Sequence, residues 1–158
     1  MLALAALGAG ACGSDSDDSG EPKGSAAPET KEQRSKPAAA NGTAIKLADS
    51  QYGKVLFDRA GQAIYLFDKE KSDRSDCYDA CAAAWPPVLT DGKPQAAAGI
   101  DASLLGTTRR NDGKEQVTYN GHPLYYYAHE GRNEVRCHNV REFGGLWLAL
   151  DGKGNAID

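Results

Sequence analysis

Three cysteines and one histidine are the residues best suited to chemistry in this chain. Cys77 and Cys81 are four positions apart, and Cys137 stands directly before His138. Thiolates and imidazoles are ligands that suit Cu(I) or Zn. If two related halves packed about a pseudo-twofold axis, these four side chains could form one metal site. The same thiols could instead carry out thiol–disulfide exchange.

A short helix is expected to position the first two cysteines. Asp76 can cap a helix, the alanines that follow favour it, and Pro86-Pro87 end it. We therefore predict a helix over Cys77–Ala84, with the two cysteines one turn apart and within reach of a disulfide. A local structural disulfide between Cys77 and Cys81 is the interpretation we favour. Cys137 is then left over, and it could be buried, paired between molecules or reactive.

The chain begins with an apolar segment that stops at small residues and Cys12. This resembles the lipobox of a bacterial secreted lipoprotein. The resemblance implies that residues 1–11 are a signal peptide and that Cys12 carries lipid, which would anchor the protein to the outer face of the bacterial cell membrane. Because no Lys or Arg precedes the apolar run, we expect the natural leader to start further upstream. The alternative is a buried N-terminal helix of a soluble domain.

Residues 12–45 are expected to be a lipidated cysteine followed by a disordered linker. The linker is rich in Ser, Asp, Pro, Ala and Gly and has no aromatic residue, so it cannot bury enough apolar surface to fold. Residues 46–158 hold all the aromatic residues and are expected to form a single β-rich domain. The formal net charge of −4 with no basic stripe excludes nucleic acid as an expected partner.

An internal repeat divides that domain into residues 53–98 and 113–158. A shift of sixty positions aligns Tyr65 with Tyr125 and Cys77 with Cys137. It also aligns the Asp-Gly-Lys sequence at 91–93 with the one at 151–153. Two related halves that share one core would produce this pattern.

Each repeat is expected to start with a β-hairpin. The apolar runs 54–58 and 62–67 form the first, and the runs 115–119 and 123–127 flank Asn120-Gly121, a dipeptide typical of tight hairpin turns. Residues 107–110 could add a strand. The predicted fold is mainly β, an antiparallel meander of two pseudo-repeated halves with one short helix.

Four aromatic residues share one face of their strands. The period of two places Tyr65 with Phe67, and Tyr125 with Tyr127. We expect these pairs to line the core. A ligand-stacking platform is the alternative.

The motifs together resemble the bacterial secreted-repeat lipoproteins with a Tyr-x-aromatic-x-x-Asp motif, a family of unassigned function. The resemblance is carried by residues 65–70, by Cys77-x-x-x-Cys81 with the following Ala-Ala-Ala-Trp-Pro-Pro, and by 117–127. Glu70 and Glu130 stand where the motif has Asp. The resemblance implies an extracytoplasmic location and a fold, and it implies no activity.

No hydrolase motif or phosphate-binding loop is present in the sequence. We therefore expect a non-catalytic binding or envelope-associated module with no cofactor, held at the membrane by its lipid. The alternative is copper, zinc or redox handling through Cys77, Cys81, Cys137 and His138.

Overall fold

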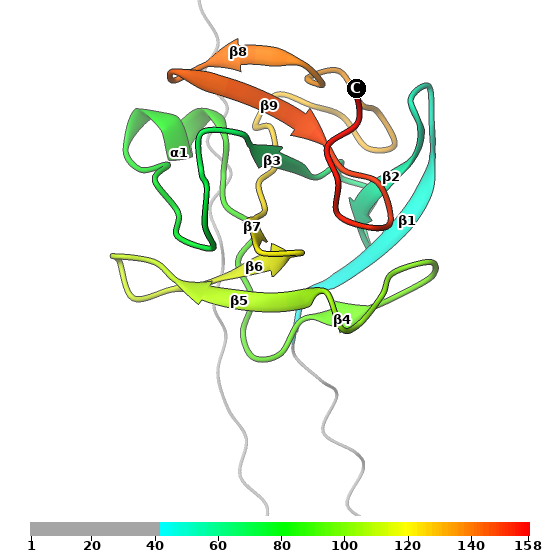
Figure 1. The fold of residues 1–158 in the computed structure, drawn as a ribbon, viewed down its shortest axis with the longest axis horizontal. Helices are drawn as coiled ribbons and strands as arrows, with labels where there is room; N and C mark the ends of the chain where they lie inside the picture. Colours follow the sequence, from blue (N-terminus) through cyan, green and yellow to red (C-terminus); the bar gives the residue numbers. More distant parts are fainter. Residues whose placement is uncertain (1–41) are drawn as a thin grey trace, which may run out of the picture. The chain divides into compact units, whose positions relative to one another are not determined.

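The computed structural model describes residues 42–158. The predicted signal peptide, Cys12 and nearly all of the predicted linker lie outside this range. The elements are β1 (Ala44–Ser50), β2 (Gly53–Asp58), β3 (Tyr65–Phe67), α1 (Ala80–Ala84), β4 (Gln95–Ala96), β5 (Leu105–Arg109), β6 (Glu115–Tyr119), β7 (His122–Pro123), β8 (Val140–Glu142) and β9 (Gly145–Ala149) (Figure 1). The prediction of a mainly β fold with one short helix is confirmed.

Three small sheets of three strands each account for these strands. Their orders are β2-β1-β4, β3-β9-β8 and β5-β6-β7. All neighbours are antiparallel except β1 and β4, which pair in parallel. Strand β1 takes in Ala44 and Ile45, two residues of the range expected for the linker, because the Ile45 side chain is fully buried in the core.

The second predicted hairpin is present in part. Strand β6 covers residues 115–119 as expected, and β5 pairs with it along its whole length. Asn120 and Gly121 form the turn with φ values of 49° and 77°, which is the backbone conformation that favours these two residues. Leu124 N–H still donates to Val117 O of β6 at 3.0 Å, and beyond it the chain leaves β6, because Tyr125 pairs with Tyr65 and Pro87 instead.

The first predicted hairpin is reduced to one bridge. Phe57 forms a bridge with Ala63, while the whole of β2 pairs with β1 and the whole of β3 pairs with β9. In both repeats the second run of the expected hairpin is therefore taken by a segment far away in sequence.

The helix is shorter than predicted and starts later. Asp79, with φ of 51° and no side-chain capping bond, precedes α1, so that Cys77 lies outside the helix. Asp76 is not the cap: its N–H donates to Glu70 Oε1 at 2.7 Å. The prediction that Asp76 caps the helix was therefore wrong, because the bond to the buried Glu70 carboxylate holds the Asp76 backbone outside the helix.

A pseudo-twofold arrangement relates the two repeats. Tyr65 and Tyr125 exchange both backbone hydrogen bonds, each with an N···O distance of 2.9 Å. The Tyr65 hydroxyl donates to Glu130 at 2.6 Å, and the Tyr125 hydroxyl donates to Glu70 at 2.6 Å. Each repeat thus supplies the buried acceptor for the tyrosine of the other repeat.

The last segment of each repeat crosses to the other one. Strand β9 pairs with β3, and Asp68 N–H donates to Leu146 O at 2.9 Å. In the same way Ala128 N–H donates to Ala84 O at 2.9 Å, and Pro87 pairs with Tyr125. The crossing segments make each half depend on the other for its backbone pairing.

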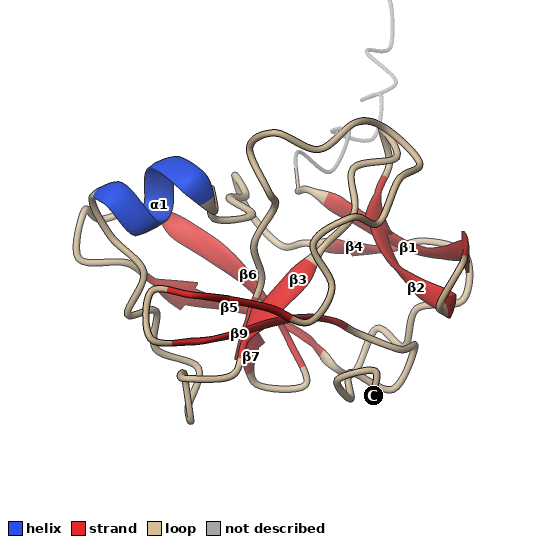
Figure 2. Ribbon diagram, turned by 90° about the horizontal axis from the view of Figure 1, so that it is seen from above, coloured by secondary structure: helices blue, strands red, loops and turns tan. Residues whose placement is uncertain are grey.

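Stacked aromatic rings fill the space between the repeats. The Trp147 ring lies between Phe67 and Trp85, with centroid distances of 4.2 and 4.0 Å and nearly parallel planes. Tyr65 meets Trp85 edge-on, and Tyr125 meets Trp147 edge-on. Strand β3, which carries Tyr65 and Phe67, pairs with β9, which carries Trp147, and β7 lies close to β3 (Figure 2). Such pairs add stability beyond the area that they bury.

Candidate functional site

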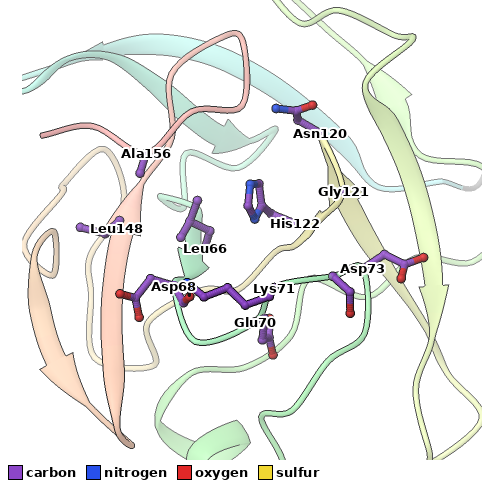
Figure 3. A pocket seen from close by; sticks show the side chains of 11 residues that line it. Leu66, Asp68, Glu70, Lys71, Asp73, Asn120, Gly121, His122, Leu148 and Ala156 are labelled. Atoms are coloured by element: carbon purple, nitrogen blue, oxygen red, sulfur yellow. Dashed lines mark hydrogen bonds between the residues drawn. The ribbon is translucent and has the colours of Figure 1, made fainter.

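A cavity of about 650 Å³ lies where the two repeats meet. The loop 68–73, which follows β3, forms one side of it, and the turn 120–122 between β6 and β7 forms another (Figure 3). Leu66 of β3, Leu148 of β9 and Ala156 complete the lining. Leu66 and Leu148 are direct partners in the β3–β9 ladder, so the sheet itself sets the apolar floor.

The loop on one side of the cavity is fixed by hydrogen bonds. Asp68 Oδ1 accepts from Leu146 N–H at 2.6 Å, and Lys71 Nζ donates to Asp68 O at 2.6 Å. Asp73 is exposed at the far end of the same loop. The cavity therefore carries both signs of charge around an apolar floor.

His122 projects into the middle of the cavity beside Leu66 (Figure 3). Burial lowers the pKa of His122, and the nearby charge of Lys71 lowers it further. The imidazole is therefore neutral at pH 7, and it offers one hydrogen-bond donor and one acceptor.

Glu70 forms part of the cavity lining, although its carboxyl group is almost fully buried, at 3% exposed. Burial raises its pKa to about 7, against the opposing effect of hydrogen bonds from the Tyr125 hydroxyl and Asp76 N–H. The Asp76 charge raises this pKa, and Arg110 lowers it.

A buried cation supports the same network. The Arg110 guanidinium donates to Ser75 Oγ at 2.7 Å, to Gln116 Oε1 at 2.7 Å and to Cys77 O at 2.8 Å. Ser75 Oγ in turn lies 2.8 Å from the Tyr125 hydroxyl oxygen. Arg110 therefore ties the disulfide loop to the polar centre of the fold.

The predicted disulfide between Cys77 and Cys81 is present, with a Cα–Cα distance of 5.3 Å. Cys137 is a buried free thiol, and burial followed by the charges of Glu130 and Glu142 raises its pKa to about 11. His138 accepts a hydrogen bond from Ala149 N–H through Nδ1 at 3.2 Å.

The metal site that was the alternative interpretation of these residues is not assembled. Cys77 and Cys81 are bonded to each other, and His138 Nδ1 is engaged by the backbone. Within residues 42–158, no group of three or more His, Cys, Asp or Glu side chains is arranged to hold a metal ion. The pseudo-twofold arrangement on which that site depended is present, but it brings together tyrosine and glutamate rather than the cysteines.

The four aromatic residues lie mostly in the core. Tyr65 and Tyr125 are fully buried, Phe67 is 2% exposed, and Tyr127 packs at the edge of the same cluster. The alternative of a ligand-stacking platform does not hold for the first three, because no ring face of theirs reaches solvent.

Sequence reasoning did not single out the cavity residues. Asp68, Lys71, Asp73 and His122 belong to loops and turns whose juxtaposition depends on strand crossings between the repeats. The repeat alignment did match Glu70 with Glu130, but it showed only that both repeats have a glutamate at this position. That each glutamate accepts from the tyrosine of the other repeat is seen only in the structure.

The chain belongs to the family of secreted repeats of unknown function. The family model matches residues 46–89 and 106–151, which agree with the two halves seen in the fold. Membership indicates an extracytoplasmic protein. No curated protein and no solved structure matches the chain. No helix within residues 42–158 is long and apolar enough to cross a bilayer.

The raised pKa of Glu70 predicts a specific pH dependence of stability. The folded state holds this proton more tightly than the unfolded state, so the contribution is full below pH 4.5 and is lost as the pH rises to about 7. Relative to Glu70→Gln, which mimics the protonated form, the wild type should lose up to about 1.4 kcal/mol per pH unit within this window. Urea unfolding of both proteins at several pH values measures this difference in the free energy of unfolding. A difference between the two proteins that does not vary with pH would contradict this assignment.

The burial of Cys137 predicts an inert thiol. A thiol with a pKa of about 11 has almost no thiolate at pH 7.5, and the side chain is 9% exposed. Iodoacetamide should leave Cys137 unmodified in the folded protein and alkylate it after denaturation, as read from the mass of its peptide. Equal rates in both states would restore the thiol-exchange interpretation.

Proposed function

We propose that this protein is a lipid-anchored extracytoplasmic binding module that acts without catalysis or a cofactor. Cys12 carries the lipid, residues 13–43 are the tether, and the domain that follows presents its cavity outside the cell. Envelope association through the anchor and ligand binding in the cavity are the two parts of this role.

The cavity between the repeats is the observation that supports binding most directly. It is built by two loops that belong to different repeats and by a floor that the β3–β9 ladder sets. A volume of about 650 Å³ lies within the range of small-molecule sites. Polar groups of both kinds surround an apolar floor, which is the usual composition of a ligand pocket.

The arrangement of the thiols favours binding over redox chemistry. The Cys77–Cys81 bond links two residues of one loop, and Cys137 is a buried thiol with a raised pKa. A reactive cysteine requires the opposite, an accessible thiolate with a lowered pKa.

The anchor is supported by the sequence around Cys12 and by membership in a secreted family. A lipid-bearing cysteine with two or more acyl chains binds a bilayer firmly, whereas a single chain binds only marginally.

Replacement of Cys12 tests the anchor. In the full natural chain, Cys12→Ser should move nearly all of the protein from the membrane fraction to the soluble fraction, because no site for the lipid remains. Ser14→Ala, a change two residues away, serves as the matched control and should stay with the membrane. The anchor is disproved if Cys12→Ser remains membrane-bound in the same amount as the wild type.

A further inference from the structure

The pseudo-twofold axis gives the cavity a counterpart in the second repeat. Leu66 corresponds to Tyr126, sixty residues later, and the two hold matching places in the fold. Leu66 pairs with Leu148 of the crossing strand β9. Tyr126 N–H donates to Pro86 O of the other crossing segment at 2.8 Å. Each residue directly follows the central tyrosine of its repeat and faces the crossing segment of the other repeat, although the two crossing segments differ in register by two residues.

In the second repeat a phenol ring occupies the counterpart space. The Tyr126 ring packs against the apolar cluster that contains Ile64 and Leu124. Its hydroxyl donates to Asp58 Oδ2 at 3.3 Å. An apolar floor thus supports the ring, and a carboxylate accepts from its hydroxyl.

A loop seals that space. Asn133 N–H donates to Gly61 O at 2.7 Å, and Gln62 Nε2 donates to Glu130 O at 3.3 Å. The fit is so close that a Cβ on Gly61 would lie 2.5 Å from Asn133 Oδ1.

In the first repeat the ring is missing and the two residues that form the seal are different or open. Leu66 has no ring, Asp73 takes the place of Asn133, and Gly121 takes the place of Gly61. A Cβ on Gly121 would meet nothing within 4 Å. The cavity is therefore the place where the first repeat lacks the filling that the second repeat supplies from its own chain.

We propose that the cavity binds an uncharged six-membered ring that carries a hydroxyl group, and that this ring occupies the place which Tyr126 fills in the second repeat. The proposal rests on the proposed function, since it names the ligand class of the same cavity. Leu66 and Leu148 receive the apolar face of the ring. The neutral imidazole of His122 points into this space and is the hydrogen-bond partner for the hydroxyl of the ring, while Asp68 and Asp73 lie at the two ends of the lining loop (Figure 3).

The charges around the cavity oppose an anion most strongly, because Asp68 and Asp73 repel it. Beside His122 the ammonium of Lys71 repels a cation, and its charge also lowers the pKa of His122. A phenol and a monosaccharide unit are both uncharged six-membered rings with a hydroxyl group, so the experiment must distinguish between them.

The probes are phenol, methyl glucoside, benzoate and benzylamine, titrated into the folded protein and followed by NMR shifts of the backbone amides. Phenol or methyl glucoside should bind with one equivalent and shift the amides of residues 120–122, and whichever binds more tightly identifies the source of the ring. The two charged probes should bind at least about tenfold more weakly, which corresponds to 1.4 kcal/mol.

Leu66→Tyr is the decisive variant. It places in the first repeat the ring that the second repeat already has, so it should fill the cavity and raise the Kd at least about tenfold while the protein stays folded. Leu89→Tyr adds the same ring at an exposed leucine outside the cavity lining and should bind as the wild type does. Asp73→Asn, which restores the residue type of the sealing loop, provides a second test that needs no change in the core and should also weaken binding.

The outcomes separate the ligand class from the binding role. If benzoate or benzylamine binds in the cavity and the neutral rings do not, the ligand class is wrong and the proposed binding function stands. If the neutral rings bind equally well to the wild type, Leu66→Tyr and Asp73→Asn, the assignment to this cavity is overturned. If none of the four probes binds, both the ligand class and the binding function at this cavity fail.

Discussion

Two exchanged hydrogen bonds lie at the centre of this protein. The hydroxyl of each central tyrosine donates to a glutamate of the opposite repeat, and the two O···O distances are equal at 2.6 Å. Both carboxylates are buried, so an unpaired one would be costly. Because the acceptor always comes from the other repeat, neither half can satisfy its own polar core. Strand β9 of the second repeat likewise pairs with β3 of the first, and Trp147 stacks on Trp85. Both repeats are therefore needed to complete the domain.

The departures from this symmetry matter as much as the symmetry itself. The second repeat fills the space beyond its central strand with Tyr126 and closes it with Asn133. The first repeat has Leu66 and Asp73 at these positions, and a cavity remains. The second repeat therefore shows how the corresponding space in the first repeat is arranged when it is filled and closed. Duplication in this fold supplies a stable scaffold, and divergence at a few positions leaves an open cavity.

The sequence predicted the local features of the fold well. The Asn120-Gly121 turn, strand β6, the disulfide and the division into two repeats are all present, since short-range spacing and turn chemistry determine them. The hairpin partners and the cap at Asp76 were not predicted correctly. The hairpin partners are replaced by pairing with the other repeat, and the cap is replaced by the bond from Asp76 N–H to the buried Glu70 carboxylate. The sequence of a single segment contains no information about such long-range contacts. The cavity was missed for the same reason, because its loops meet only through the crossing strands.

Native-state hydrogen exchange tests the interdependence of the two repeats most directly. The slowest-exchanging amides of β3 and those of β6 should report the same free energy of opening and the same dependence on denaturant, since global unfolding exposes both repeats together. Tyr65→Phe, placed in one half, should lower the opening free energy of both strands by the same amount. If β3 and β6 instead open with different free energies, and the substitution affects only one of them, then the halves fold independently and this account is wrong.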